Sequence, residues 1–139
     1  MSVPYLLDTD ACIYLINRRA GYERLIAHFE KLAYGEILIS SISAAELEFG
    51  IAKSKRGAEN RNRYALFIAR FEIAPFDDGA ASAYGPLRAA LESSGTPIGP
   101  LDTLIAAHAL CLNATLITNN VREFSRVEKL KIENWFDSA

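Results

Sequence analysis

Short apolar runs alternate in this chain with segments whose apolar residues recur at helical spacing. The runs cover residues 3–8, 36–42, 72–76, 114–118 and 131–135. Helical patterns cover residues 9–17, 21–33, 43–52, 58–71, 78–92 and 101–111. Strands that alternate with helices predict βαβ units, which build a parallel sheet with helices on both faces. The sequence therefore predicts an α/β fold.

A single domain over residues 1–139 is expected, because the sequence has no internal repeat, low-complexity stretch or linker-like composition. The clearest loop is SSGTPIGP at residues 93–100, where serine, glycine and proline gather. Gly85 and Pro86 fall inside the helical pattern of residues 78–92, and a kink is predicted there.

Several classes of protein are excluded by composition. No run approaches the ~18 apolar residues that a membrane span needs, and the N-terminus lacks a secretory signal pattern. A cytoplasmic protein without a membrane partner is therefore expected. Cys12 and Cys111 lie outside metal-ligand spacing, so zinc is not expected and both thiols are predicted to be buried. His28 and His108 give little support to Ser–His–Asp or Cys–His catalysis, and His108 is expected to pack in the core.

Three carboxylates stand where an apolar run meets a turn or a helix start. Asp8 ends the first run, Glu46 lies just after the second, and Asp102 lies in the first helical turn after the loop. In a parallel sheet, sites form beyond the carboxyl ends of the strands, where the strand order reverses. Three carboxylates meeting there would repel one another unless a hard cation held them. This pattern predicts a Mg²⁺ site, and Mg²⁺ with few protein ligands indicates phosphate chemistry.

Each carboxylate also has a purely structural explanation. Asp8 could cap the following helix, and Asp102 could complement a helix dipole. Glu46 matches the S-x-x-E capping box with Ser43, and for Glu46 alone capping is the slightly stronger explanation. The joint arrangement of the carboxylates favours a functional site.

Other residues near these positions are further candidates. Asn119 and Asn120 follow the fourth apolar run, where they could face a metal-bound water or a phosphate, or could simply form a turn. Glu123 is close behind as a possible further site residue, or could be only a surface glutamate. Ala106 and Ala109 share the helix face of Asp102, and their small side chains predict open space for a substrate beside that carboxylate.

Positive charge gathers in one segment, although the net charge is −2 and the pI is about 5.7. Within residues 51–63 a single glutamate stands against five basic residues, Lys53, Lys55, Arg56, Arg61 and Arg63. Such a cluster could bind phosphate groups or form a solvated helix face, and the sequence supports both interpretations equally.

The chain as a whole resembles the PIN-domain ribonucleases, and among them the VapC toxins of toxin–antitoxin pairs. The motifs that carry the resemblance are LLDTDACIYLI, SSISAAELEFGIAKS, GTPIGPLDTLIAAHAL, LITNNVREFSRV and IENW, in this order and with compatible spacing. The resemblance implies an α/β/α sandwich, Mg²⁺- or Mn²⁺-dependent RNA cleavage, and a VapB antitoxin as partner. It also implies a homodimer, or a larger toxin–antitoxin assembly.

The site residues follow from the same resemblance. Asp8, Glu46 and Asp102 match the acidic cluster of the family, with Asp8 and Asp102 as direct metal ligands. Many PIN domains carry a fourth acid after the late strand, whereas this chain has TNN at residues 118–120 and Glu123 as the nearest carboxylate. The TNNVREF and ENW motifs resemble a VapC branch that cleaves the anticodon stem-loop of initiator tRNA, which would inhibit translation.

Two other functions stay open at this point. Asp8 as nucleophile and Asp10 as acid would suit an aspartyl-phosphate phosphatase. An RNA-binding module whose carboxylates only cap helices is the third alternative. If the chain is a toxin, an apolar groove lined by helices within residues 12–32 and 43–70 is expected to receive a peptide of the antitoxin.

Overall fold

A computed structural model describes residues 3–136 as a five-stranded parallel sheet with helices on both faces. The strands are β1 (Tyr5–Leu7), β2 (Ile37–Ser40), β3 (Glu72–Ala74), β4 (Thr115–Ile117) and β5 (Lys131–Glu133). Their order is β3-β2-β1-β4-β5, and every neighbouring pair is parallel. The predicted α/β fold is therefore confirmed, with each strand shorter than its apolar run.

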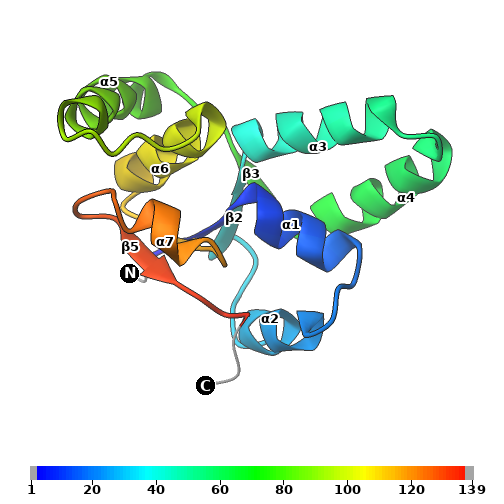
Figure 1. Cartoon of the computed structure of the whole chain (residues 1–139). Coiled ribbons are helices and arrows are strands. Elements are labelled where there is room, and N and C mark those ends of the chain that lie inside the picture. Colours follow the sequence, from blue (N-terminus) through cyan, green and yellow to red (C-terminus); the bar gives the residue numbers. More distant parts are fainter. Residues whose placement is uncertain (1–2, 137–139) are drawn as a thin grey trace.

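Seven helices occur in the described residues (Figure 1). They are α1 (Thr9–Ile16), α2 (Tyr22–Phe29), α3 (Ser41–Lys53), α4 (Gly57–Ile68), α5 (Asp78–Ser93), α6 (Pro100–Leu112) and α7 (Val121–Phe124). The sequence did not predict α7, because four residues are too few to show a helical period. α5 passes through Pro86 as one helix of 16 residues.

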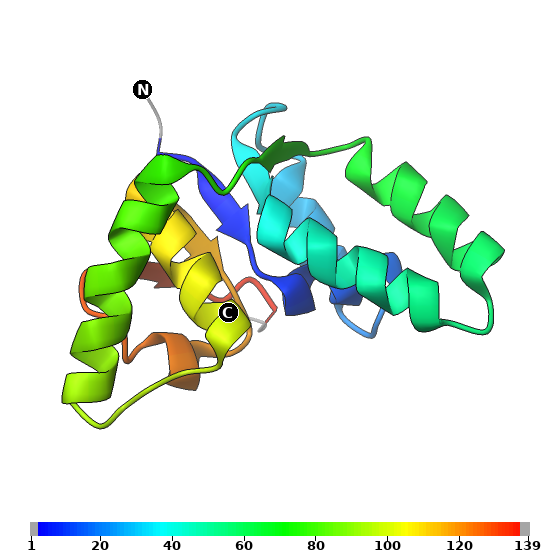
Figure 2. The ribbon, with the colours of Figure 1, turned by 90° about the horizontal axis from the view of Figure 1, so that it is seen from above.

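The sheet separates two hydrophobic cores. Figure 2 shows α5 and α6 on one side of the sheet and the α3–α4 pair on the other. Successive residues of a strand point to opposite faces, so Leu6 packs with Ile105 in one core and Leu7 packs with Phe67 in the other. Both leucines are fully buried. This double burial explains why β1 is an uninterrupted apolar run rather than an alternating one.

The chain reverses its direction across the sheet at β1. β2 and β3 lie to one side of β1, while β4 and β5 lie to the other. Ligand sites of open parallel sheets form beyond the carboxyl ends of the strands at such a reversal. Asp8 directly follows β1 at this point.

Two local predictions were wrong. The helix after β2 begins at Ser41, and the capping residue is Ser40, whose Oγ accepts a hydrogen bond from Ile42 N at 3.0 Å. The predicted capping box of Ser43 and Glu46 therefore does not form, because both residues already lie inside the helix. Cys12 is buried as expected, but Cys111 lies exposed on α6 despite its apolar neighbours.

Within residues 3–136, no helix is both long and apolar enough to cross a membrane.

Candidate active site

Asp8 stands between β1 and α1 as a buried carboxylate with defined partners. Its Oδ1 accepts a hydrogen bond from Ala11 N at 2.7 Å, which caps α1. Its Oδ2 accepts a hydrogen bond from Thr118 Oγ1 at 2.6 Å, and Thr118 directly follows β4. The pKa of Asp8 is raised to about 6, since burial outweighs the lowering effect of these two hydrogen bonds. Asp8 is thus both a helix cap and a carboxylate that ionises reluctantly.

Glu46 is held beside Asp8 by the first residue of α1. Thr9 Oγ1 donates a hydrogen bond to Glu46 Oε1 at 2.7 Å and also hydrogen-bonds Ser43 Oγ at 3.0 Å. Because Thr9 follows Asp8 in the chain, this contact links the C-terminal end of β1 to α3. The negative charge of Glu46 contributes to the raised pKa of Asp8.

Asp102 lies in the first turn of α6 and is half-buried. Its pKa is raised to about 7, first by burial and then by the negative charges of Glu123, Asp8, Glu46 and Asp10. The structure therefore brings the three predicted acids into one electrostatic neighbourhood.

The predicted open space beside Asp102 was wrong. Ala106 and Ala109 are fully buried, in the core that also holds Leu6 and Leu116. Small residues on that face let α6 approach the sheet closely, so they serve packing.

Asn120 and Glu123 join the same neighbourhood from the turn after β4. Glu123 Oε1 accepts a hydrogen bond from Gly99 N at 2.8 Å, and its Oε2 accepts one from Asn120 Nδ2 at 2.8 Å. These bonds lower the pKa of Glu123 below its usual value, with the Gly99 amide as the largest cause. Glu123 thus stays ionised beside Asp102, whose pKa moves in the opposite direction.

Two supporting residues escaped the sequence analysis. Thr9 holds Glu46 and Thr118 holds Asp8, each through a side-chain hydroxyl. Both threonines were visible as neighbours of candidate residues in the DTD and TNN motifs. Their partners lie 37 and 110 positions away, so no local pattern could have identified the contacts.

The donor chemistry of these residues fits a hydrated divalent cation. Asp8, Glu46 and Asp102 offer only carboxylate oxygens, which Mg²⁺ prefers. Among residues 3–136, no three carboxylate, histidine or cysteine side chains are close enough to form a ready-made coordination set. Mg²⁺ keeps several waters and is commonly held by one or two protein carboxylates. The acids therefore fit Mg²⁺ with most of its water shell retained, and do not fit a closed all-protein cage.

The histidines lie outside this cluster. His108 is buried, with Nδ1 at 2.8 Å from Ser40 Oγ and its ring edge-on to Phe76, as expected for a packing histidine. His28 is exposed and stacks on Trp135, with ring centroids 4.3 Å apart.

The basic segment spans the end of α3, the following turn and the start of α4. Arg61 pairs with Glu48 at 2.7 Å, and Arg63 pairs with Glu59 at 3.0 Å. Lys53 lies over the ring of Phe49, 5.1 Å from its centroid. In Figure 1 the α3–α4 turn is at the end of the helix pair remote from the sheet. Part of this positive charge is thus neutralised locally, and the segment is set apart from the acids.

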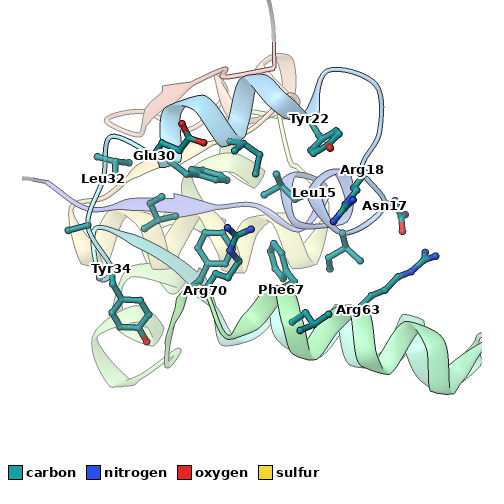
Figure 3. Close-up of a pocket in the computed structure, with 18 residues that line it drawn as sticks. Leu15, Asn17, Arg18, Tyr22, Glu30, Leu32, Tyr34, Arg63, Phe67 and Arg70 are labelled. Carbon is teal, nitrogen blue, oxygen red and sulfur yellow. The ribbon is translucent and has the colours of Figure 1, made fainter.

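A large groove opens between α2 and α4 (Figure 3). Its volume is about 1080 Å³, and Leu15, Phe29 and Phe67 are among the apolar side chains that line it. Arg63 and Arg70 of this lining add positive charge from the α4 side. The predicted groove thus exists between the expected helices, although none of the described residues that line it comes from α3.

Comparisons with known proteins identify the family. The PIN domain model matches residues 5–130. Over 94% of this chain and 97% of the relative, the sequence is 44% identical to a ribonuclease VapC2 of Rickettsia felis. With the same coverage it is 38% identical to a tRNA(fMet)-specific endonuclease VapC of Salmonella typhimurium.

Solved structures agree with the sequence comparison. The fold matches a chain in the crystal structure of DNA-bound VapBC from Salmonella typhimurium with a TM-score of 0.89 and 37% identity. This match covers 96% of this chain and 99% of the other. The chain therefore belongs to the PIN-domain family and, within it, to the VapC ribonucleases, the toxins of VapBC toxin–antitoxin systems.

Proposed function

We propose that this chain cleaves RNA with a Mg²⁺-dependent site, also served by Mn²⁺, in which Asp8, Glu46 and Asp102 are the catalytic acids. Asp8 and Asp102 are the direct metal ligands in this proposal. One observation carries it: the pKa of Asp102 is raised to about 7, with the charges of Asp8 and Glu46 among the causes. Burial is the largest cause of both raised pKa values, and the repulsion between neighbouring carboxylates adds to it; a bound divalent cation would relieve both effects.

The residues of the chain supply orientation in this mechanism. Ala11 N and Thr118 Oγ1 fix both oxygens of Asp8, while Thr9 fixes Glu46. When bound, the metal lowers the pKa of a coordinated water and stabilises charge on the scissile phosphate. In-line hydrolysis would leave a 5′-phosphate and a 3′-hydroxyl.

The proposed substrate is initiator tRNA, cut in the anticodon stem-loop. The name of the Salmonella typhimurium relative specifies tRNA(fMet), and the present chain shares 38% identity with that relative. Lys55 and Arg56 are exposed in or beside the α3–α4 turn, without an ion pair among the described residues. They, with Lys53, Arg61 and Arg63, are the proposed contacts to RNA phosphates outside the cleavage site.

Cleavage of purified RNAs, including initiator tRNA, tests the proposal. Asp8→Asn, Asp102→Asn and Glu46→Gln should each lower single-turnover cleavage by more than ~100-fold, because metal-ion stabilisation is worth several kcal/mol. Chelation should do the same to the wild type. Asp78→Asn, an exposed carboxylate in the first turn of α5, is the matched control and should cleave normally. Full activity of the Asp8 or Asp102 variant would refute the metal site.

The alternative functions lack comparable support. A phosphatase would need Asp10 to work with Asp8, but the Asp10 side chain is exposed in the first turn of α1. In a non-catalytic RNA-binding module there is no reason to bury the carboxylates of Asp8 and Asp102, which raises the pKa of both. RNA cleavage that persists in Asp10→Asn would exclude the phosphatase mechanism.

The proposed partner is a VapB antitoxin whose peptide occupies the groove between α2 and α4. Its apolar lining and arginines suit an amphipathic segment that carries acidic residues. Ile26→Glu, which places a charge in the lining, should weaken antitoxin binding while RNA cleavage continues. Ile73→Glu on the exposed side of β3 is the control and should bind normally. A homodimer in the bacterial cytoplasm, joined to the antitoxin in a larger assembly, completes this proposal.

A further inference from the structure

The chain after β5 runs to α2, the helix that forms one side of the groove (Figure 1). We call residues 134–136 of this segment the strap. The indole of Trp135 is buried and stacks on His28 of α2, with ring centroids 4.3 Å apart. Arg24, one turn before His28, donates a hydrogen bond from Nη1 to Phe136 O at 2.8 Å. The strap therefore holds α2 by a ring stack and by a hydrogen bond from a charged donor.

The strap is itself fixed to the rest of the domain. Phe136 packs edge-on against Tyr14 of α1, with ring centroids 4.8 Å apart, and the Trp135 ring lies 4.9 Å from that of Tyr5 in β1. Asn134 Oδ1 accepts a hydrogen bond from Phe136 N at 2.8 Å, which fixes the bend of the strap. The strap thus joins α2 to α1 and to the sheet.

α2 depends on contacts of this kind for its position. Of its eight residues only Leu25 is buried, and its N-cap is Gly21, which has no side chain to accept a hydrogen bond. A helix of this length is unstable in water on its own, so tertiary contacts decide whether it forms and where it lies.

Opposite sides of α2 contact the strap and the groove. Arg24 and His28 are four positions apart, so they lie on one side of the helix and meet the strap there. Ile26 lies about half a turn from both and lines the groove. Phe29 belongs to both sides, because it lines the groove and its ring centroid is 5.7 Å from that of Trp135.

A row of rings continues from Trp135 to α4. The Phe29 ring is edge-on to that of Phe71 at 5.6 Å between centroids, and the Phe71 ring lies 4.9 Å from that of Phe67 in α4. These three phenylalanines line the groove, whereas Trp135 is not among the described residues that line it. Trp135 is therefore the outer support of a row of rings that spans the distance between α2 and α4.

We infer that the strap holds α2 in place as a wall of the groove, and that Trp135, Arg24 and His28 thereby control the affinity of the groove for its occupant from outside its lining. This inference rests on the partner proposed above for the groove. Changes at these three positions should release the ribonuclease from its antitoxin without lowering RNA cleavage.

Three changes separate the strap from the general stability of the fold. Trp135→Ala removes the outer ring, and Trp135→Phe is the conservative replacement that keeps a ring there. Arg24→Met combined with His28→Ala removes the contacts from the α2 side, at two exposed positions. Phe76→Ala is the matched control, because it also removes a packed ring, but one that contacts His108 of α6.

Two measurements on the full chain test the inference. Amide hydrogen exchange in α2 reports how often this helix opens. Titration with the dye anilinonaphthalenesulfonate reports the groove without any antitoxin. The dye is an apolar anion, which suits an apolar lining that includes Arg18, Arg63 and Arg70 (Figure 3). Energy transfer from Trp135, the sole tryptophan of the chain, locates the bound dye in the wild type.

Trp135→Ala and the Arg24–His28 double variant should each speed exchange in α2 by about 30- to 100-fold, because each loses contacts with the strap. Both should bind the dye at least about fivefold more weakly, since the groove is complete only in molecules that keep α2 in place. Trp135→Phe and Phe76→Ala should stay within about threefold of the wild type in both measurements, and all of these variants should cleave RNA within about threefold of it.

Several outcomes would overturn the inference. Unchanged exchange in Trp135→Ala would mean that the strap does not hold α2, and faster exchange with unchanged dye binding would mean that α2 does not set the affinity of the groove. Equal dye binding by Ile26→Glu and the wild type would show that the groove does not take an apolar anion. A parallel loss of RNA cleavage in the strap variants would indicate a general role in folding.

The design keeps this inference separate from the proposed function. If Trp135→Ala does not fold, the Arg24–His28 double variant decides the same question, because both of its positions are exposed. Failure of an antitoxin to bind the wild type would refute the proposed partner, while the exchange and dye measurements would still decide whether the strap controls the groove. Cleavage by Asp102→Asn tests the metal site independently of α2.

Discussion

Asp8 and Asp102 are carboxylates whose protonation is changed strongly by their surroundings. The ordinary pKa of an aspartate is 3.8, and in the fold the pKa rises to about 6 for Asp8 and about 7 for Asp102. A group whose pKa is higher in the folded state binds its proton more tightly there. The stability that these two protons provide is therefore fully present below pH 3.8, the ordinary pKa of an aspartate. It is lost as the pH rises through about 6 and about 7.

Asp102→Asn should therefore stabilise the metal-free protein at high pH. The amide keeps the shape of the carboxyl group but cannot ionise. At pH 8 with chelator we expect the Tm to rise by at least about 4 °C, which corresponds to roughly 1 kcal/mol in a domain of this size. Below pH 3.8, where the carboxyl group stays protonated in both the folded and the unfolded state, the difference should disappear. Asp78→Asn is the control and should not produce this rise in Tm. A lower Tm for Asp102→Asn at pH 8 would contradict the repulsion between Asp102 and the neighbouring carboxylates.

Thr9 offers a test of how Glu46 is oriented. Thr9→Val removes the hydroxyl that donates to Glu46 Oε1 while keeping the β-branched shape. Cleavage should fall by roughly tenfold, as is common when the partner of a site carboxylate is lost. Thr9→Ser retains the hydroxyl and should cleave close to the wild-type rate. Equal rates for the valine and serine variants would show that this hydrogen bond does not matter.

At the scale of helices and strands, a side-chain hydrogen bond joins α6 to the last residue of β2, which is also the N-cap of α3. His108 Nδ1 and Ser40 Oγ are 2.8 Å apart, and Ser40 also caps α3. Burial lowers the pKa of His108, so the ring is neutral and its stabilising contribution declines as the pH falls below the ordinary value of 6.5.

Ser40→Ala should destabilise this contact in two ways at once. It removes the cap of α3 and leaves a buried imidazole nitrogen without its partner, which together should cost about 2 kcal/mol. Urea unfolding at pH 7 measures the change in the free energy of unfolding. Ser82→Ala, an exposed position within α5, provides the comparison and should change stability by less than about 0.5 kcal/mol.

Sequence periodicity predicted most of these elements because burial controls them. The β1 run is apolar on both faces since Leu6 and Leu7 enter different cores, and this double burial is visible in the sequence. The role of Glu46 was not predictable in the same way. Its position after Ser43 imitates a local cap, while its real partner, Thr9, lies 37 positions away. The same reason concealed the links of Thr118 and Glu123, because no local pattern encodes a hydrogen bond across the sheet.

At the scale of the whole molecule, the acids and the groove use different parts of one framework. The acids gather where β1, α3 and α6 meet, and the groove lies between α2 and α4. α1 belongs to both, since Thr9 and Asp8 stand at its start and Leu15 lines the groove near its end. An occupant of the groove therefore contacts the helix that also orients the acids.

Divalent metal should stabilise the entire fold if the acids hold it. A ligand that binds only the folded state adds about 2.7 kcal/mol at 100 times its Kd. Saturating Mg²⁺ should therefore raise the Tm of the wild type above its value in chelator at matched ionic strength. Asp102→Asn should show a much smaller rise. An equal rise in both proteins would place the metal elsewhere.

β1 is only three residues long, so insertions and deletions in it should inactivate the protein in a different way from substitutions at the acids. Its three residues contribute to both cores and end at Asp8. Inserting or deleting one residue there would exchange the leucines between the cores and turn the aspartate away from its neighbours. In a screen for survivors of toxin expression, such changes should appear as insoluble protein, whereas soluble, inactive survivors should carry substitutions at the acids.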